Sequence, residues 1–171
     1  KDFKYQYPNV TAAGSWRTAV SLNTARRVLA GVGTYTASLA FGGYNGTTQV
    51  ATTELYNGTN WTSVNSLNGV KSALAGAGTA TATAALSFGG YAPPGNQATT
   101  ETWNGTNWTE VNDLNTARYT LGGTGTNTAA LAFGGQSDPP VQAVTELWNG
   151  TNWTEVNDLN TARQGGGSAG I

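Results

Sequence analysis

Two pairs of acidic residues carry the carboxyl groups that a hydrolytic active site requires. Glu110 with Asp113, and Glu155 with Asp158, stand at matching places in two nearly identical segments. A glycosidase needs one carboxyl group as acid and another as base or nucleophile, in different environments that separate their pKa values. Copied pairs in copied surroundings do not meet that requirement. We therefore expect no catalytic residue and predict that the chain is not an enzyme.

The rest of the composition removes most other chemistry. The chain contains no cysteine and no histidine. This excludes disulfides, thiolate nucleophiles and zinc–thiolate sites, and it removes the commonest general base and metal ligand near neutral pH. Asp138, followed by Pro139, is a lone turn residue and at best an isolated calcium ligand. We expect no metal ion and no other cofactor.

The charge and hydropathy of the chain argue against nucleic acid and membranes as its binding partners. The formal net charge is −1 and the eight Lys and Arg residues are scattered, whereas nucleic-acid binding needs a clustered basic face. The mean hydropathy is −0.32 and no long apolar run predicts membrane insertion. Only 10% of the residues are charged. A surface rich in Thr, Asn and Gly favours an extracellular, cell-surface or virion location.

A long internal repeat dominates the chain. The run WNGTNWTEVNDLNTAR occupies residues 103–118 and again residues 148–163. A tryptophan marks each repeat at spacings of 45, 47 and 45 residues, at Trp16, Trp61, Trp108 and Trp153. Periods of 40 to 50 residues are typical of propeller blades and similar arrays.

Each period predicts four short antiparallel strands, so the expected fold class is all-β. In the last full period we expect strands over residues 119–126, 129–133, 143–148 and 152–156. The Asn-Gly pair at 149–150 predicts a tight hairpin between the last two strands.

The hairpin places two aromatic residues opposite each other on neighbouring strands. The expected pairs are Trp148 with Trp153, Trp103 with Trp108, and Tyr56 with Trp61. Such pairs stabilise a sheet beyond their burial. We interpret the tryptophans as packing between neighbouring sheets; the alternative is an exposed role in stacking on sugars.

Side-chain size changes along each repeat. The first two strands are rich in glycine and alanine, and the tryptophans come later. Sheets that radiate from a common axis crowd at their inner strands and diverge outside, so this gradient favours a radial array over a flat sandwich.

These features resemble the kelch repeat, the blade motif of kelch and galactose-oxidase-like β-propellers, over about residues 14–171. The resemblance implies four-stranded propeller blades, and Arg26, Arg118 and Arg163 match the arginine before the innermost strand. The absent histidines mean that the copper chemistry of galactose oxidase does not carry over. The repeat is also similar to those in phage tail and marine microbial surface proteins. The matching glycine and aromatic positions are Gly42, Gly43, Tyr56, Trp61, Gly89, Gly90, Trp103, Trp108, Gly134, Gly135, Trp148 and Trp153.

The chain holds too few repeats for a ring by itself. The repeat array is expected over residues 14–171, after an extended segment at 1–13. It would contain three complete blades, at about 26–65, 72–112 and 118–157. Partial strands at 15–21 and 164–171 would flank these blades. Propellers ordinarily need at least four blades, and unpaired edges invite pairing. The chain is therefore a fragment of a longer array, or its two ends build a fourth blade, or copies complete one another.

The loops that follow the paired glycines differ between repeats. They cover residues 44–50, 91–98 and 136–143. Variable loops on a rigid scaffold are common binding surfaces, although they could equally be tolerated insertions. The candidate ligand-binding residues are Tyr44, Asn45, Gln49, Tyr91, Asn96, Gln97, Gln136, Asp138 and Gln142.

Two functions remain after these exclusions. The first is a structural or adhesion protein of the tail-fibre or surface-fibre type, whose loops bind a cell-surface glycan or protein. The second is a self-assembling filament subunit whose terminal strands link copies. A propeller-type hydrolase is the least favoured, because histidine and cysteine are missing.

Overall fold

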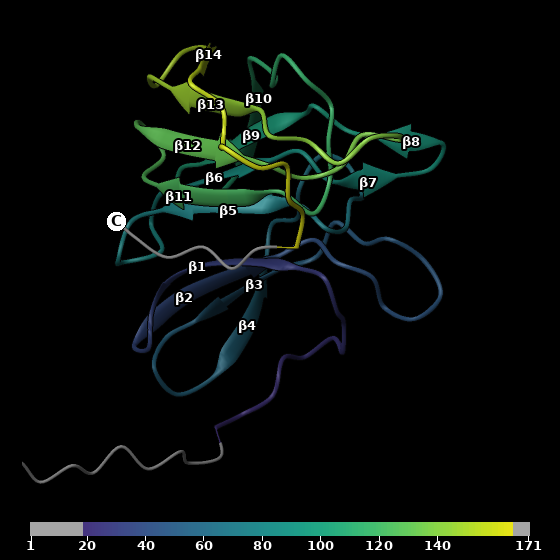
Figure 1. The fold of residues 1–171 in the computed structure, drawn as a ribbon. Helices are drawn as coiled ribbons and strands as arrows, with labels where there is room; N and C mark the ends of the chain where they lie inside the picture. The colour runs from purple at the N-terminus through teal and green to yellow at the C-terminus, as the bar shows by residue number, and fades with distance from the viewer. Residues whose placement is uncertain (1–18, 166–171) are drawn as a thin grey trace, which may run out of the picture.

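The computed structural model describes residues 19–165 and contains three four-stranded antiparallel sheets and one small two-stranded sheet (Figure 1). The all-β prediction, with four-stranded antiparallel units, is confirmed. The first sheet contains β1 (Ala30–Thr34), β2 (Ala37–Phe41), β3 (Thr53–Tyr56) and β4 (Trp61–Val64). The second contains β5 (Ala75–Gly78), β6 (Ala85–Phe88), β9 (Thr100–Trp103) and β10 (Trp108–Val111). The third contains β11 (Gly122–Gly125), β12 (Ala130–Phe133), β13 (Thr145–Trp148) and β14 (Trp153–Val156), and β7 (Tyr91–Ala92) pairs with β8 (Gly95–Asn96).

The outer hairpin of each sheet forms for local reasons. The side-chain Oδ1 of Asn149 accepts hydrogen bonds from the backbone N–H groups of Thr151 and Asn152, both at 2.9 Å. Gly150 takes a φ of 93°, which is unfavourable for residues with a side chain. This turn sets the register in which Trp148 lies opposite Trp153. The same register pairs the equivalent aromatics of the other two sheets, as expected.

Two hydrophobic cores lie between the sheets rather than within one of them. One core joins the first and second sheets and the other joins the second and third. Trp108 of the second sheet packs on Phe41 of the first, with ring centroids 4.9 Å apart, and Trp153 packs on Phe88 in the same way. The second and third sheets therefore turn their tryptophans toward the sheet that precedes them in the chain.

The first strands of the three sheets lie closest to one another. β5 contacts both β1 and β11, at the middle of the molecule in Figure 1. A Cβ atom on Gly76 would lie 2.7 Å from the ring of Phe41, and one on Gly123 would lie 2.5 Å from the ring of Phe88. Small residues are required on these strands because the neighbouring sheet leaves no room for larger ones.

A row of backbone hydrogen bonds crosses the sheets beside these inner strands. The N–H of Ala73 donates to the carbonyl of Val28, the N–H of Thr120 to that of Ala73, and the N–H of Gly165 to that of Thr120. All four residues have φ between 49° and 65°. The chain therefore enters every repeat in the same left-handed backbone conformation.

That conformation explains why the first strand of the last repeat is shorter than predicted. The strand expected over residues 119–126 is restricted to Gly122–Gly125, because Thr120 has a φ of 51° and interrupts the extended backbone. Tyr119 forms only an isolated bridge, to Gln136.

The terminal predictions fall mostly outside the described residues. The extended segment 1–13 and most of the partial strands 15–21 and 164–171 lie outside 19–165. Within the described part, residues 19–21 and 164–165 form no strand.

Candidate functional site

The three variable loops lie on one side of the molecule. Each loop leaves the second strand of a sheet and returns to the third, so equivalent sheets carry their loops at the same end. In Figure 1 this is the right-hand side, where β7 and β8 form the projecting tip of the second loop. Backbone bonds from Val50 to Gly43, Gln97 to Gly90 and Gln142 to Gly135 close the base of each loop.

The first loop forms a small hollow with the start of its own repeat. The guanidinium of Arg27 lies over the ring of Tyr44, 5.2 Å from its centroid, in a cation–π arrangement. The backbones of these two residues are joined by a pair of hydrogen bonds of 3.0 and 2.9 Å. Tyr44, Asn45 and Arg27 line a hollow of about 420 Å³. This hollow offers a cation, an aromatic face and an amide to a ligand.

The second and third loops meet at Tyr119. The rings of Tyr91 and Tyr119 lie 5.8 Å apart with their planes tilted by 58°. The hydroxyl of Tyr119 donates to Asp138 Oδ1 at 3.4 Å, and the amide of Gln136 approaches the same oxygen at 3.5 Å. Desolvation and then the Asp138 carboxylate raise the pKa of the Tyr119 hydroxyl. The structure therefore brings three predicted residues together around one that was not predicted.

The remaining predicted residues hold the loops in shape. Asn45 Oδ1 accepts from the N–H groups of Thr47 and Thr48. The side-chain amide of Gln97 donates to the carbonyls of Ala92 and Gly95.

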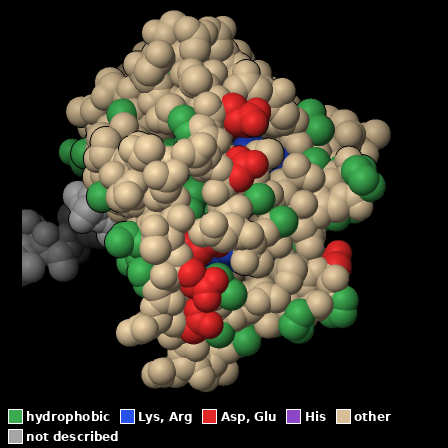
Figure 2. Space-filling model, turned by 90° about the horizontal axis from the view of Figure 1, so that it is seen from above, with side chains coloured by type: hydrophobic (Ala, Val, Ile, Leu, Met, Phe, Trp, Pro, Cys, Tyr) green, Lys and Arg blue, Asp and Glu red, His purple; other side chains and the backbone are tan. Residues whose placement is uncertain are grey.

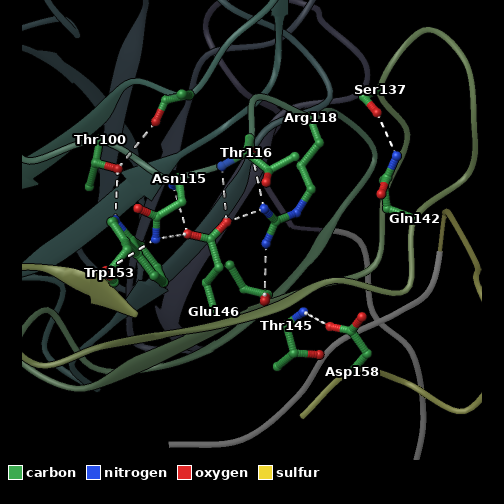
Figure 3. Close-up of polar contacts among 12 residues, drawn as sticks. Thr100, Asn115, Thr116, Arg118, Ser137, Gln142, Thr145, Glu146, Trp153 and Asp158 are labelled. Atoms are coloured by element: carbon green, nitrogen blue, oxygen red, sulfur yellow. Dashed lines mark hydrogen bonds and ion pairs between the residues drawn. The ribbon is translucent and has the colours of Figure 1, made fainter. Parts of the chain in front are cut away.

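Gln142 has the same role in the third loop, where its amide donates to Ser137 Oγ at 2.6 Å (Figure 3). It also donates to the carbonyl of Pro140 at 3.1 Å. Gln49 forms a backbone bridge to Tyr44. Asn96 has a buried side-chain oxygen that finds no donor within the described part of the chain.

A buried ion pair recurs in every sheet, and its basic residue is bonded through the backbone to the base of a loop, as Lys71 is to Val50 and Arg118 to Gln97. Glu146 on β13 pairs with Arg118, and both side chains have no exposed surface. The carboxylate also accepts from the backbone N–H groups of Asn115 and Thr116, as Figure 3 shows. Arg26 with Glu54 and Lys71 with Glu101 form the equivalent pairs. These carboxylates hold the connection between repeats against the third strand and are therefore structural.

The second sheet departs from this pattern because a lysine replaces arginine. Lys71 Nζ lies 3.0 Å from Glu101 Oε1 and 3.4 Å from Thr99 Oγ1. Arg118, in contrast, also donates to the carbonyls of Thr116 and Ala132. Burial lowers the pKa of Lys71, and the charge and hydrogen bond of Glu101 oppose that effect.

The aspartate of each acidic pair set aside in the sequence has a structural partner. Asp113 Oδ1 accepts from the N–H of Thr100 at 3.0 Å, and Asp158 Oδ1 accepts from that of Thr145 at 3.2 Å. On the face drawn in Figure 2, acidic side chains form a few groups on a surface made mostly of backbone and of side chains that are neither charged nor hydrophobic. Within residues 19–165, no three acidic side chains gather closely enough to hold a metal ion.

Four of the tryptophans are placed between the sheets and not on the loop side. Trp103, Trp108, Trp148 and Trp153 are at most 5% exposed. The packing interpretation therefore holds for these four residues, and the alternative of sugar stacking does not.

Sequence reasoning missed Arg27 and Tyr119, although a signal for them exists. Each of them directly follows the basic residue that begins its repeat, Arg26 or Arg118. The equivalent position in the second repeat is Ser72. This position varies between repeats as the loops do. A comparison of the repeats outside the loops would have found it.

None of the described residues forms a helix long and apolar enough to cross a membrane. No protein-family model matches the chain, and no curated protein matches it in sequence.

Proposed function

We propose that this chain is a non-enzymatic structural and adhesion protein in which kelch-like blades carry a binding surface for a cell-surface glycan or protein. An extracellular, cell-surface or virion location belongs to this proposal. The observation that carries it is the grouping of repeat-variable side chains on the loop side. There, two polar and aromatic sites form, one from Tyr44 with Arg27 and the other from Tyr91 with Tyr119 and Asp138.

The chemistry of these sites suits a glycan better than a charged polymer. Aromatic rings pack against the apolar faces of sugar rings, while nearby amides, hydroxyls and carboxylates bond the sugar hydroxyls. Several acidic residues elsewhere are engaged in structure, as with Glu146 and Asp158. The loop side thus combines variable residues with side chains that the scaffold does not require.

A glycan array with paired variants tests the proposal. We expect the wild-type chain to bind a defined set of glycans, and Tyr91→Ala or Tyr44→Ala to lose that binding without a change in melting temperature. Tyr35→Ala is the matched control, because Tyr35 is 90% exposed in the turn at the other end of β1. Silence across the array and on whole cells, or equal loss with the control, would overturn the proposal.

A further inference from the structure

The outward face of the third sheet exposes side chains whose equivalents are buried in the other two sheets. Phe133 and Leu131 are only half-buried, whereas the matching Phe88 and Leu86 have no exposed surface. Further out on the same face, Leu147 and Val156 are 41% and 39% exposed. We call this surface the rear face; it consists of Leu131, Phe133, Thr145, Leu147 and Val156.

A buried hydroxyl on the rear face lacks the partner that its equivalents have. Thr53 Oγ1 accepts a 3.0 Å hydrogen bond from the indole N–H of Trp108, and Thr100 Oγ1 accepts one of the same length from Trp153. Thr145 Oγ1 is buried and has no hydrogen-bond partner among the described residues. In the other two sheets, the donor at this position is an indole N–H of the sheet that follows.

A third contact links neighbouring sheets inside the molecule, and beside the rear face the asparagine that would donate in this contact is exposed. The side-chain amide of Asn65 donates to Asn107 Oδ1 in the hairpin of the second sheet, and that of Asn112 donates to Asn152 Oδ1 in the third, both at 2.8 Å. The equivalent residue beside the rear face is Asn157, which is exposed. It lies where it could hold the hairpin of one more sheet.

The complementary surface is on the first sheet of the same chain. Tyr56 and Trp61, with ring centroids 5.0 Å apart, face away from the second sheet and are half-buried. The matching Trp103 and Trp108 are 1% and 5% exposed, because the first sheet covers them. We call the surface formed by Tyr56, Trp61 and the hairpin at 57–60 the front face.

We propose that copies of this chain associate head to tail, with the front face of one copy packed on the rear face of the next. The contact repeats the two internal interfaces: Trp61 covers Phe133 and donates to Thr145 Oγ1, and Asn157 donates to the hairpin at 57–60. A head-to-tail contact forms a closed ring when its rotation allows. Two copies would bring six four-stranded sheets together, within the range of known propellers.

Residues 163–165, at the end of the described chain, must move away for this contact to form. The carbonyl of Arg163 accepts from the N–H of Gly135, just as that of Arg118 accepts from Gly90, so residues 163–165 occupy the position of the start of a next repeat. All three are exposed. In the association, the second copy's residues 26–28 replace them.

Light scattering with size-exclusion chromatography tests the association over a range of concentrations. We expect a mass of at least twice the chain mass of 17.6 kDa at high concentration. Trp61→Glu and Phe133→Glu should each weaken association at least about tenfold, as is usual when a central aromatic contact is lost. Tyr35→Ala is the control and should leave the mass unchanged.

Mixing the two variants separates loss of contact from loss of folding. Each variant keeps one intact face, so an equimolar mixture should regain one wild-type contact and form a heterodimer that neither variant forms alone. Thr145→Val, which keeps the shape but removes the acceptor, should weaken association without lowering the melting temperature. A monomeric mass at every concentration, or a mixture that stays monomeric, would overturn the proposal.

A substitution in residues 163–165 tests whether the rear face is covered by a second copy or by the chain's own end. Proline at position 165 cannot donate to Thr120 and cannot adopt the φ of 65° found there. Gly165→Pro should free the rear face and strengthen association between copies. If the chain's own end covers this face instead, the variant will weaken folding and leave the mass unchanged, which contradicts the proposal.

Discussion

At the scale of single residues, the most informative position is the one where the repeat is broken. Arg26 and Arg118 each donate to a glutamate and to two backbone carbonyls within their own repeat. Among the residues that the structure describes, the Lys71 ammonium donates to Glu101 and Thr99 only. The guanidinium fork serves several acceptors at once, which a single ammonium on a flexible stem cannot reach.

Lys71→Arg should therefore stabilise the chain. We expect an increase of roughly 1–2 kcal/mol in the free energy of unfolding, because the second sheet gains the two carbonyl contacts that its neighbours have. Urea denaturation followed by circular dichroism measures the change. The reciprocal variant, Arg118→Lys, should lower the same quantity; stabilisation by both or by neither would contradict the explanation.

The Lys71 ammonium also predicts a pH dependence. Its pKa is lowered in the folded chain, chiefly by burial, so the unfolded chain binds more protons between the folded pKa and about 10.5. The contribution of Lys71 to stability therefore rises as pH increases through that window. Arginine stays charged, so the advantage of Lys71→Arg over wild type should shrink at alkaline pH, which paired urea titrations at several pH values would show.

Tyr119 offers a spectroscopic test of the loop side. The Asp138 carboxylate contributes to the raised pKa of its hydroxyl, after desolvation. Asp138→Asn should move this pKa down toward the ordinary value, because the negative charge that opposes ionisation is removed. Ultraviolet absorbance titration of tyrosinate measures it, with Tyr119→Phe identifying the transition; an unchanged titration would show that Asp138 does not contact Tyr119.

At the scale of elements, the inner strands are limited by the space between sheets. β5 and β11 carry glycine where the ring of a phenylalanine from the preceding sheet approaches, at Gly76 and Gly123. Because glycine has no side chain, the phenylalanine ring fits against each strand at these points.

Gly123→Ala should destabilise the chain by about 1–3 kcal/mol, the usual effect of overpacking. The added methyl would lie 2.5 Å from the Phe88 ring and 3.0 Å from Ala75 Cβ. Gly69→Ala is the control, because nothing lies within 4 Å of its added Cβ, and it should stay within about 0.5 kcal/mol of wild type. Thermal melting of both variants compares them, and equal melting temperatures would refute the crowding argument.

At the scale of the whole molecule, stability resides in the interfaces between sheets. A sheet of four short strands has little core of its own, and both hydrophobic clusters are shared between neighbouring sheets. Arrays of this kind are stabilised by contacts between adjacent units. Among residues 19–165, the two end sheets consequently differ from the middle one, because each packs against another sheet on one side only.

Equivalent tryptophans should therefore differ in their contribution to stability. Trp153→Ala should cost about 3–5 kcal/mol, because it empties a buried interface and leaves Thr100 without its donor. Trp61→Ala should cost clearly less at dilutions where the chain is monomeric, since its indole is only half-buried. Denaturant unfolding of the two variants gives the comparison, and equal losses would show that burial between sheets does not explain the tryptophans.

Much of the fold could be predicted because its signals are local or repeated. The Asn-Gly turn determines the register of Trp148 and Trp153, and the glycine-rich segments anticipated the crowded inner strands. The candidate site was predicted only in part. Tyr91 and Asp138 were expected, but their contacts with Tyr119 join residues 28 and 19 positions apart, and no local pattern encodes such a distance.

The sequence by itself determined the repeated unit: four strands, a tight outer hairpin and paired aromatics, all of which depend on turn chemistry and alternation within a few residues. Only the tertiary structure decided which partners these units meet. Glu146 finds Arg118, and Trp153 finds Thr100, because the stacking of one sheet on the next brings them together. The same stacking leaves the Thr145 hydroxyl without a donor among the described residues, since hydrogen bonding across sheets depends on which sheet comes next.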